Sequence, residues 1–319
     1  MIDPFFVAGR PSQGPVAVHE TGRTQDRGRS EAPGWIGALV CGLPVLWMTL
    51  FFLLPLLGVV AMSFFSRGPD GEVTLPLTWE NYRRLLGFGE LGFDPFYPVA
   101  LGRSLLLGAV TTVFCLALAL PLALWLARLS DRWQALALTL LVIPFWTNFL
   151  VRTYAWQVLL SPDSPLTQWL NRLGVGSAGE ALYPGWGAVL IAMVCDFLPF
   201  MVLPIYVSAE KLNWTLVEAA VDLGANRWQA FRHAVWPQLR PGVAAGVVLV
   251  FLPATGQFVV PDLLGGAKIA FLGNLLQQQF GPSRDWPFGA ALATVALALL
   301  LLVLAARGCR ALRQEAPAP

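Results

Sequence analysis

Two charged side chains interrupt stretches that are otherwise apolar, and they have the clearest capacity for chemistry in this sequence. Asp196 lies within the apolar run 181–209, and Arg152 lies within a run that extends from 133 to about 160. A carboxylate near the middle of a membrane span costs roughly 2.5–3.5 kcal/mol on insertion scales, so it usually faces a pathway or a partner. Asp196 is therefore a candidate for binding an ammonium group. Arg152 has a comparable depth and is the candidate for an internal ion pair with it, and a paired Asp196 can still line a channel.

Other residues near these two charges are candidates for the same pathway. Aromatic rings can add cation–π contacts of up to about 2 kcal/mol when desolvated, although most aromatic residues of membrane spans face lipid or the core. Asp262 could attract a cation, or it could be a solvated loop acid. The full set of pathway candidates is Arg152, Asp196, Trp146, Asn148, Tyr154, Phe200, Gln257, Phe258 and Asp262.

The sequence contains no cluster of residues that predicts a catalytic site or a metal site. The four cysteines are far apart, without a Cys-x-x-Cys pair, and the two histidines are distant from each other. We expect no catalytic residue, no metal ligand and no enzyme activity. A net charge of +2 gives no basic field suited to nucleic acid.

The elements that must position these residues are membrane spans. Hydrophobic residues make up 56% of the chain, charged residues only 13%, and the mean hydropathy is +0.62. A span needs roughly 20 apolar residues. The charge-poor stretches predict an all-α integral membrane protein with a transmembrane domain over 35–306. Its six spans are expected at about 35–65, 100–127, 134–160, 186–206, 242–262 and 286–306.

Lys and Arg residues predict the orientation of these spans. With both ends in the cytoplasm, the cytoplasmic segments hold thirteen basic residues and the outer segments hold seven. Residues 1–34 are rich in Gly, Pro, Ser and Arg and predict a mobile cytoplasmic tail, and residues 307–319 form a second cytoplasmic tail. Gly242 and Gly246 form a GxxxG pattern in the fifth span, which favours helix packing within the chain or against a second membrane subunit.

The segment 207–240 predicts a helix–turn–helix. Asn213 can cap a first helix, and Gly224 stands where a helix stop needs a left-handed residue. Asn226 can cap a second helix with Gln229 as its capping-box partner, and Pro237 limits the end of that helix.

This segment resembles a known family. Glu218, Ala219, Ala220, Gly224 six residues after the Glu, and Pro237 look like the EAA loop of membrane subunits in binding-protein-dependent ABC importers. The resemblance implies the type I permease fold, with 207–240 as a coupling loop that docks on an ATPase subunit. Its ATPase-coupling residues would be Glu218, Ala219, Ala220 and Gly224. An amphipathic hairpin resting on the membrane surface is the structural alternative.

Further segments are similar to the spermidine/putrescine permease branch of that family. They are 144–148, 198–206, 263–268 and 284–289. The resemblance implies a pair of ATPase subunits, a second and non-identical permease, an extracytoplasmic binding protein and a bacterial inner membrane location. The chain has no G-x-x-x-x-G-K-[ST] motif, so it carries no cofactor itself, and ATP and Mg would be bound by the partner ATPase.

The functional hypothesis is a permease subunit of an ATP-driven importer for polyamines or a related small cationic solute. Two alternatives remain open: the same machinery could carry another small organic solute, or the chain could be a proton-coupled secondary carrier that uses Asp196. The carrier does not account for the 207–240 loop.

Overall fold

Helices form almost the whole structure, a computed structural model that describes residues 42–68, 71–89, 92–172, 183–266 and 270–315. The tail predicted over 1–34 lies outside the described residues. The strands within the described ranges form two short antiparallel pairs: β1 (Ser66–Arg67) with β2 (Val73–Thr74), and β3 (Phe88–Gly89) with β4 (Gly92–Phe93).

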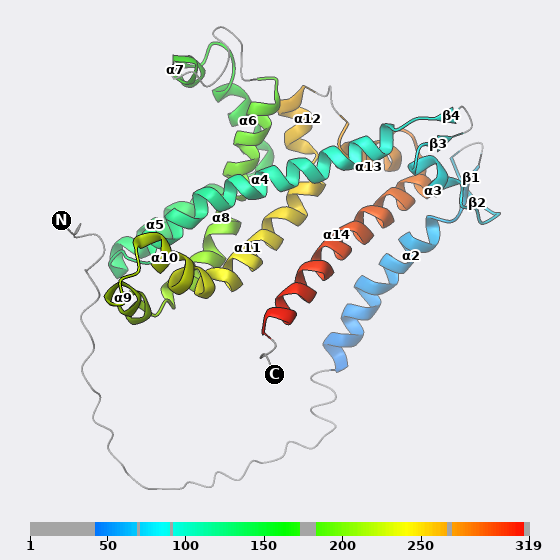
Figure 1. Cartoon of the computed structure of the whole chain (residues 1–319). Coiled ribbons are helices and arrows are strands. Elements are labelled where there is room, and N and C mark those ends of the chain that lie inside the picture. Colours follow the sequence, from blue (N-terminus) through cyan, green and yellow to red (C-terminus); the bar gives the residue numbers. More distant parts are fainter. Residues whose placement is uncertain (1–41, 69–70, 90–91, 173–182, 267–269, 316–319) are drawn as a thin grey trace.

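Three helices pack together at the centre of the molecule: α4 (Phe96–Leu126), α8 (Trp186–Glu210) and α11 (Trp236–Gly256) (Figure 1). Close packing of α11 on α8 depends on the GxxxG glycines. A Cβ atom at Gly242 would lie 2.4 Å from the Pro204 carbonyl oxygen, and one at Gly246 would lie 2.7 Å from Met201 Sδ. Small residues of this kind let helix backbones approach in a membrane, where the hydrophobic effect does not drive helices together. The predicted packing role is confirmed within the chain.

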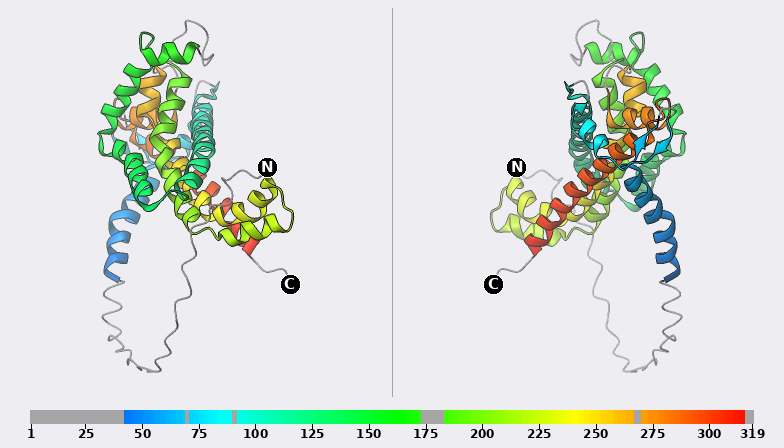
Figure 2. Two further views of the ribbon diagram at one scale, coloured as in Figure 1. Left: turned by 90° about the vertical axis from the view of Figure 1, so that its left-hand side faces the viewer. Right: turned by 90° about the vertical axis from the view of Figure 1, so that its right-hand side faces the viewer.

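A second group of helices lies beside this centre. The apolar helix Gly42–Met62 includes the π-helical turn η2 (Thr49–Leu53) and α2 (Leu54–Met62), and α2 packs against α14 (Trp286–Glu315) (Figures 1 and 2). The short helix α3 (Glu80–Leu85) contacts both of them: Asn81 Nδ2 donates to the Ser63 carbonyl oxygen at the end of α2 at 2.9 Å, and Arg84 Nη1 donates to Asp285 Oδ2 at the start of α14 at 2.8 Å. α14 continues past residue 306, so the predicted boundary of the C-terminal tail does not coincide with a helix end.

The third predicted span is broken. α5 (Asp131–Val142) leads into the 3-10 turn η3 (Ile143–Trp146), and α6 (Phe149–Leu159) leaves at an angle of 96°. The local sequence explains the break. Pro144 has no N–H to continue the helix, and the Asn148 side chain caps α6 by accepting a hydrogen bond from Leu150 N at 2.8 Å. The short helix α7 (Pro165–Arg172) follows α6.

A second break separates α11 from α12 (Val259–Gly265), and α13 (Leu272–Phe280) precedes α14. The segment before α11 corrects one prediction. The second helix of the helix–turn–helix does not end at Pro237: α10 (Arg227–Ala230), the π-helical turn η4 (Phe231–Val235) and α11 form one helix over Arg227–Gly256. Pro237 stands in the first turn of α11, where a missing N–H is tolerated because the π-turn precedes it.

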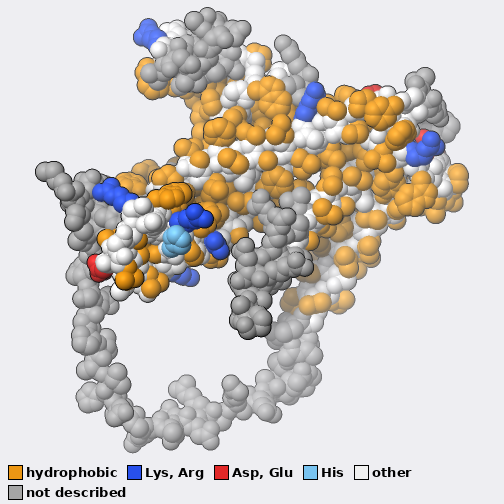
Figure 3. All heavy atoms as spheres, in the orientation of Figure 1, with side chains coloured by type: hydrophobic (Ala, Val, Ile, Leu, Met, Phe, Trp, Pro, Cys, Tyr) orange, Lys and Arg blue, Asp and Glu red, His pale blue; other side chains and the backbone are white. Residues whose placement is uncertain are grey.

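By length and composition, four helices can cross a membrane: Gly42–Met62, α4, α8 and the helix Arg227–Gly256. The bent pair α5–α6 adds a fifth candidate, and Trp286–Leu302 is a shorter apolar stretch. Hydrophobic side chains cover most of the visible face between the ends of the molecule (Figure 3). The structure therefore confirms that the chain is built from apolar helices, whereas helix length alone gives four or five candidate crossings and not the six predicted.

Candidate functional site

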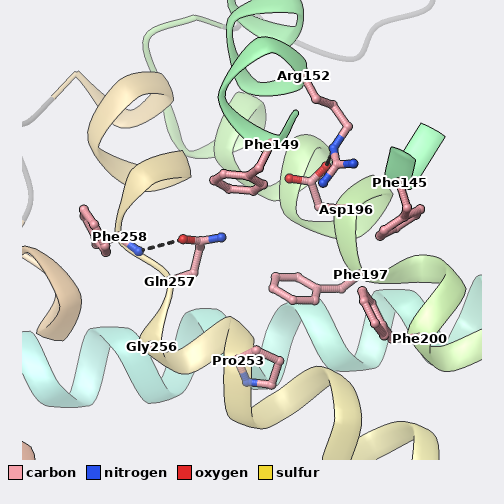
Figure 4. Close-up of a pocket in the computed structure, with 10 residues that line it drawn as sticks. All are labelled: Phe145, Phe149, Arg152, Asp196, Phe197, Phe200, Pro253, Gly256, Gln257 and Phe258. Carbon is pink, nitrogen blue, oxygen red and sulfur yellow. Dashed lines mark hydrogen bonds and ion pairs between the residues drawn. The ribbon is translucent and has the colours of Figure 1, made fainter. Parts of the chain in front are cut away.

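A cavity of about 420 Å³ lies where the two broken helices meet the middle of α8 (Figure 4). Cavities of a few hundred Å³ hold small organic ligands. Its lining residues come from the η3–α6 break, from α8 and from the α11–α12 break. They are Phe145, Phe149, Arg152, Asp196, Phe197, Phe200, Pro253, Gly256, Gln257 and Phe258.

Asp196 and Arg152 form an ion pair in the wall of this cavity. Arg152 Nε lies 2.7 Å from Asp196 Oδ1, and the two side chains are 18% and 3% exposed. The guanidinium also donates to the Pro144 carbonyl oxygen at 3.0 Å. Its Cζ lies 4.9 Å from the Phe145 ring centroid and 5.6 Å from that of Phe149. The predicted internal pair is therefore present, and it lines the cavity.

The carboxylate of Asp196 is not saturated by this ion pair. Both of its oxygens are buried, and neither accepts a hydrogen bond from the part of the chain that the structure describes. Buried polar atoms are normally hydrogen-bonded, so a carboxylate in a cavity wall without such bonds is a candidate ligand-binding group. The Phe145, Phe197 and Phe200 rings lie nearby, with Phe145 and Phe200 edge to face at 5.4 Å.

Residues at or beside both helix breaks line this cavity. Gln257 has an extended backbone with φ −68° and ψ 130°, and its side-chain oxygen accepts a hydrogen bond from Phe258 N at 3.1 Å. Non-helical backbone at membrane depth is tolerated where protein buries it or where it lines a cavity. The breaks at 147–148 and 257–258 fit this rule, since residues next to both line the same space.

The structure divides the nine pathway candidates. Arg152, Asp196, Phe200, Gln257 and Phe258 line the cavity. The other four lie elsewhere. Trp146 and Tyr154 are 85% and 52% exposed, Asn148 caps α6, and Asp262 accepts a hydrogen bond from Asn274 Nδ2 at 3.0 Å.

Sequence reasoning missed Phe145, Phe149, Phe197, Pro253 and Gly256 as lining residues. With 20 Phe and 13 Trp in the chain, an aromatic residue in a span carries little information about its direction. A usable signal existed for Phe145 and Phe149, because they flank the proline and the capping residue of the break. The same holds for Gly256, the last residue of α11.

The second candidate site is the helical elbow, which we define as residues 213–230. Its predicted caps are confirmed. Asn213 accepts a hydrogen bond from Thr215 N at 3.1 Å, and Asn226 and Gln229 form a reciprocal capping box. Gly224 has φ +84°, a left-handed conformation that favours glycine.

The turn of the elbow has the geometry of a Schellman motif. Gly224 N donates to Val221 O at 2.9 Å, and Ala225 N donates to Ala220 O at 3.0 Å. These bonds end α9 (Trp214–Asp222) and satisfy its last carbonyls. Glu218 and Ala219 are exposed and Ala220 is half-buried, so the four predicted coupling residues share one short surface element.

Large apolar side chains on the elbow face away from the protein. Leu216, Leu223 and Trp228 are 53%, 89% and 67% exposed, whereas Val217 is buried at 2%. α9 is held to the rest of the chain at its start: Arg128 Cζ lies 4.6 Å from the Trp214 ring, and Asn213 N donates to Gln238 Oε1 at 3.0 Å. The elbow is thus a fixed projection with an exposed apolar tip.

Neither site has the composition of a metal centre, because no group of three or more His, Cys, Asp or Glu that could hold a metal occurs within the described ranges. Apolar helices, a cavity between broken helices and a capped helical elbow are features that a membrane transport component needs. Residues 35–313 match the family model described as "Binding-protein-dependent transport system inner membrane component". The chain therefore belongs to this family and is a transport component of the inner membrane, not an enzyme.

Curated relatives cover most of the chain. It is 41% identical to the spermidine/putrescine transport system permease protein PotB of Haemophilus influenzae over 81% of this chain and 88% of the relative. The PotB protein of Escherichia coli K12 is 43% identical over 81% of this chain and 92% of the relative. The sulfate transport system permease protein CysT of the same organism is 28% identical over 86% and 92%.

Solved structures share the fold. A bacterial ABC transporter that imports the acidic polysaccharide alginate contains a chain with a TM-score of 0.68 and 16% identity. The match covers 89% of this chain and 96% of that one. At this identity the likeness establishes the arrangement of helices.

Proposed function

We propose that this chain is a membrane-spanning permease subunit of an ATP-driven importer that brings spermidine, putrescine or a related small cationic solute into the cytoplasm. The observation that carries the cargo class is the Asp196 carboxylate, which lines an aromatic cavity of about 420 Å³ and accepts no hydrogen bond from the described residues. A carboxylate replaces the water lost by an ammonium group, and aromatic faces attract cations. The identity of 41–43% to PotB permeases supports the same cargo.

The proposed topology has six crossings with both termini in the cytoplasm. The four long apolar helices, the bent pair α5–α6 and the apolar part of α14 supply the six elements. Lys and Arg residues are more numerous on the side assigned to the cytoplasm. In Figures 1 and 2 the C-terminal end of α14 and the elbow extend toward the same end of the molecule, as this topology requires.

The elbow is the proposed coupling element. Its exposed tip, with Leu216, Leu223 and Trp228, offers apolar area to a groove on an ATPase subunit, and Glu218, Ala219, Ala220 and Gly224 match the EAA motif of the family. ATP and Mg belong to that partner, because the chain has no phosphate-binding loop. Closure of two ATPase subunits would move the elbow and shift the spans between inward-open and outward-open states.

The other partners follow from the family. A second, non-identical permease would complete the pathway, and a substrate-binding protein would deliver cargo to the outer loops. A solved alginate importer of the same fold was captured in complex with a cargo-bound periplasmic protein. In this chain the helix Gly42–Met62 has none of its most apolar window buried within the described structure, which leaves its surface for lipid or the second permease.

Calorimetry of the cognate binding protein with putrescine, spermidine, amino acids and sulfate tests the cargo. We expect a polyamine to bind best. The 28% identity to a sulfate permease makes an anion the specific alternative, and a preference for sulfate would remove the role proposed for Asp196. A proton-coupled carrier would instead show uptake by this chain alone that a protonophore abolishes.

A further inference from the structure

We infer that Arg152 is a tethered competitor of the cargo: its guanidinium occupies the cation position at Asp196 while the cavity is empty, and an ammonium group of the cargo displaces it. The inference rests on the proposed cationic cargo and adds a residue that sets how tightly the cavity holds it. Figure 4 shows Arg152 reaching from α6 toward Asp196 on α8.

The charges of the cavity wall support this inference. Asp196 and Arg152 cancel each other, and Gln257 is neutral, so the lining carries no net charge. Without Arg152, the empty cavity would contain an unpaired buried carboxylate, which is strongly unfavourable. With Arg152 bound, every arriving cation competes with a group on a short tether, whose effective concentration is on the order of millimolar or more. The consequence is weak binding, which suits a site that must release its cargo.

Arg152 is the member of the pair that can move. Its side chain is 18% exposed, whereas that of Asp196 is 3% exposed in the middle of the continuous helix α8. Arg152 stands in the first turns of α6, directly after a break where the chain bends by 96°. Asp196 is thus fixed, and Arg152 lies on an element with a discontinuity at its start.

The displaced guanidinium has another place to bind. It already donates to the Pro144 carbonyl oxygen at 3.0 Å and lies over the rings of Phe145 and Phe149. None of these contacts involves Asp196, so they remain when an ammonium takes the carboxylate. Asp196 is 3% exposed, so an arriving ammonium reaches its carboxylate only as the guanidinium moves aside.

Spermidine binding to the complete transporter in nanodiscs, without the binding protein, tests this inference. We expect Arg152→Gln to bind spermidine about tenfold more tightly than the natural chain, because the ammonium no longer has to displace a guanidinium; this change corresponds to about 1.4 kcal/mol. The double variant Arg152→Gln/Asp196→Asn should lose that gain. Arg103→Gln removes an exposed arginine of α4 outside the cavity and should change nothing. Equal or weaker binding by Arg152→Gln, or an unchanged gain in the double variant, overturns the inference.

Arg152→Lys covers the case in which Arg152→Gln does not assemble. A lysine keeps the charge but cannot bind Asp196 and the Pro144 carbonyl oxygen at once through one planar guanidinium. We therefore expect Arg152→Lys to bind spermidine more tightly than the natural chain and less tightly than Arg152→Gln. An unchanged affinity in Arg152→Lys would then refute the inference. Spermidine uptake by the natural transporter is measured separately. If the natural transporter takes up spermidine but the Arg152 variants bind it no more tightly, the competitor role is refuted and the proposed cargo stands. If the variants bind spermidine more tightly but the natural transporter does not take it up, the proposed cargo is refuted.

Discussion

The Asp196 carboxylate carries the account at the scale of single residues. Its Oδ1 lies 2.7 Å from Arg152 Nε in an ion pair, and both of its oxygens are buried without a hydrogen-bond partner among the described residues. The same side chain lines the cavity. Asp196 therefore combines an ion pair with an unused capacity to accept hydrogen bonds.

Asp196→Asn should lower polyamine uptake about tenfold or more, since the amide offers no charge to an ammonium and leaves Arg152 without its counterion. Initial rates of radiolabelled spermidine uptake in cells that carry the complete transporter measure this. The matched control is Asp262→Asn, because Asp262 is exposed and bonds to Asn274 outside the cavity. Equal losses in both variants would contradict a specific role for Asp196.

The sequence predicted the ionisable members of the site better than its aromatic ones. Asp196 and Arg152 stand out because a charge at membrane depth is expensive wherever it occurs. Phe149 and Phe197 do not stand out, because an aromatic ring is equally compatible with lipid, core and cavity. Trp146 was a candidate and Phe145 was not, yet the turn η3 leaves Trp146 85% exposed and places Phe145 in the cavity wall.

At the scale of elements, the elbow and the paired breaks are the informative features. The elbow was predictable in detail, because caps and left-handed stops are local: Asn213, Asn226 and Gly224 act on residues within a few positions. The end of its second helix was predicted wrongly. Pro237 is a helix stop by local rules, but the π-turn η4 lets the helix continue into α11.

Gly224→Arg should uncouple ATP hydrolysis from transport without disrupting the spans. Nothing lies within 4 Å of a Cβ at Gly224, so the new side chain projects from the elbow, and its left-handed backbone costs roughly 1–2 kcal/mol. Spermidine uptake is measured in cells that carry the complete transporter, and ATPase activity is measured on the purified complex. We expect uptake to fall while the complex still assembles. Gly224→Asn is the control, because Asn tolerates the left-handed conformation. Normal uptake by Gly224→Arg would refute the coupling role.

Gly242→Ala should destabilise the contact between α11 and α8. The added Cβ would lie 2.4 Å from the Pro204 carbonyl oxygen, which is backbone and cannot rotate away. Overpacking of this kind costs about 1–3 kcal/mol. A lower Tm of the purified permease is expected, and Gly102→Ala serves as the control because nothing lies within 4 Å of its Cβ. An unchanged Tm for Gly242→Ala would mean that the helices do not pack as described.

At the scale of the whole molecule, the chain joins a cavity in the bundle to an exposed elbow through the helix Arg227–Gly256. This helix begins in the elbow and ends at Gly256, a residue of the cavity wall. A displacement of the elbow therefore reaches the cavity along one element. Composition predicted the membrane and its apolar helices, but neither break near the cavity could be located by hydropathy, since both lie inside apolar stretches.

Proteoliposomes that contain this chain, its permease and ATPase partners and the binding protein test the central claim most directly. With ATP supplied to the ATPase side, we expect spermidine to be carried across the bilayer toward that side against its gradient. Transport should stop when the ATPase subunit is omitted or is unable to hydrolyse ATP. Uphill transport by the permease subunits alone would contradict the account.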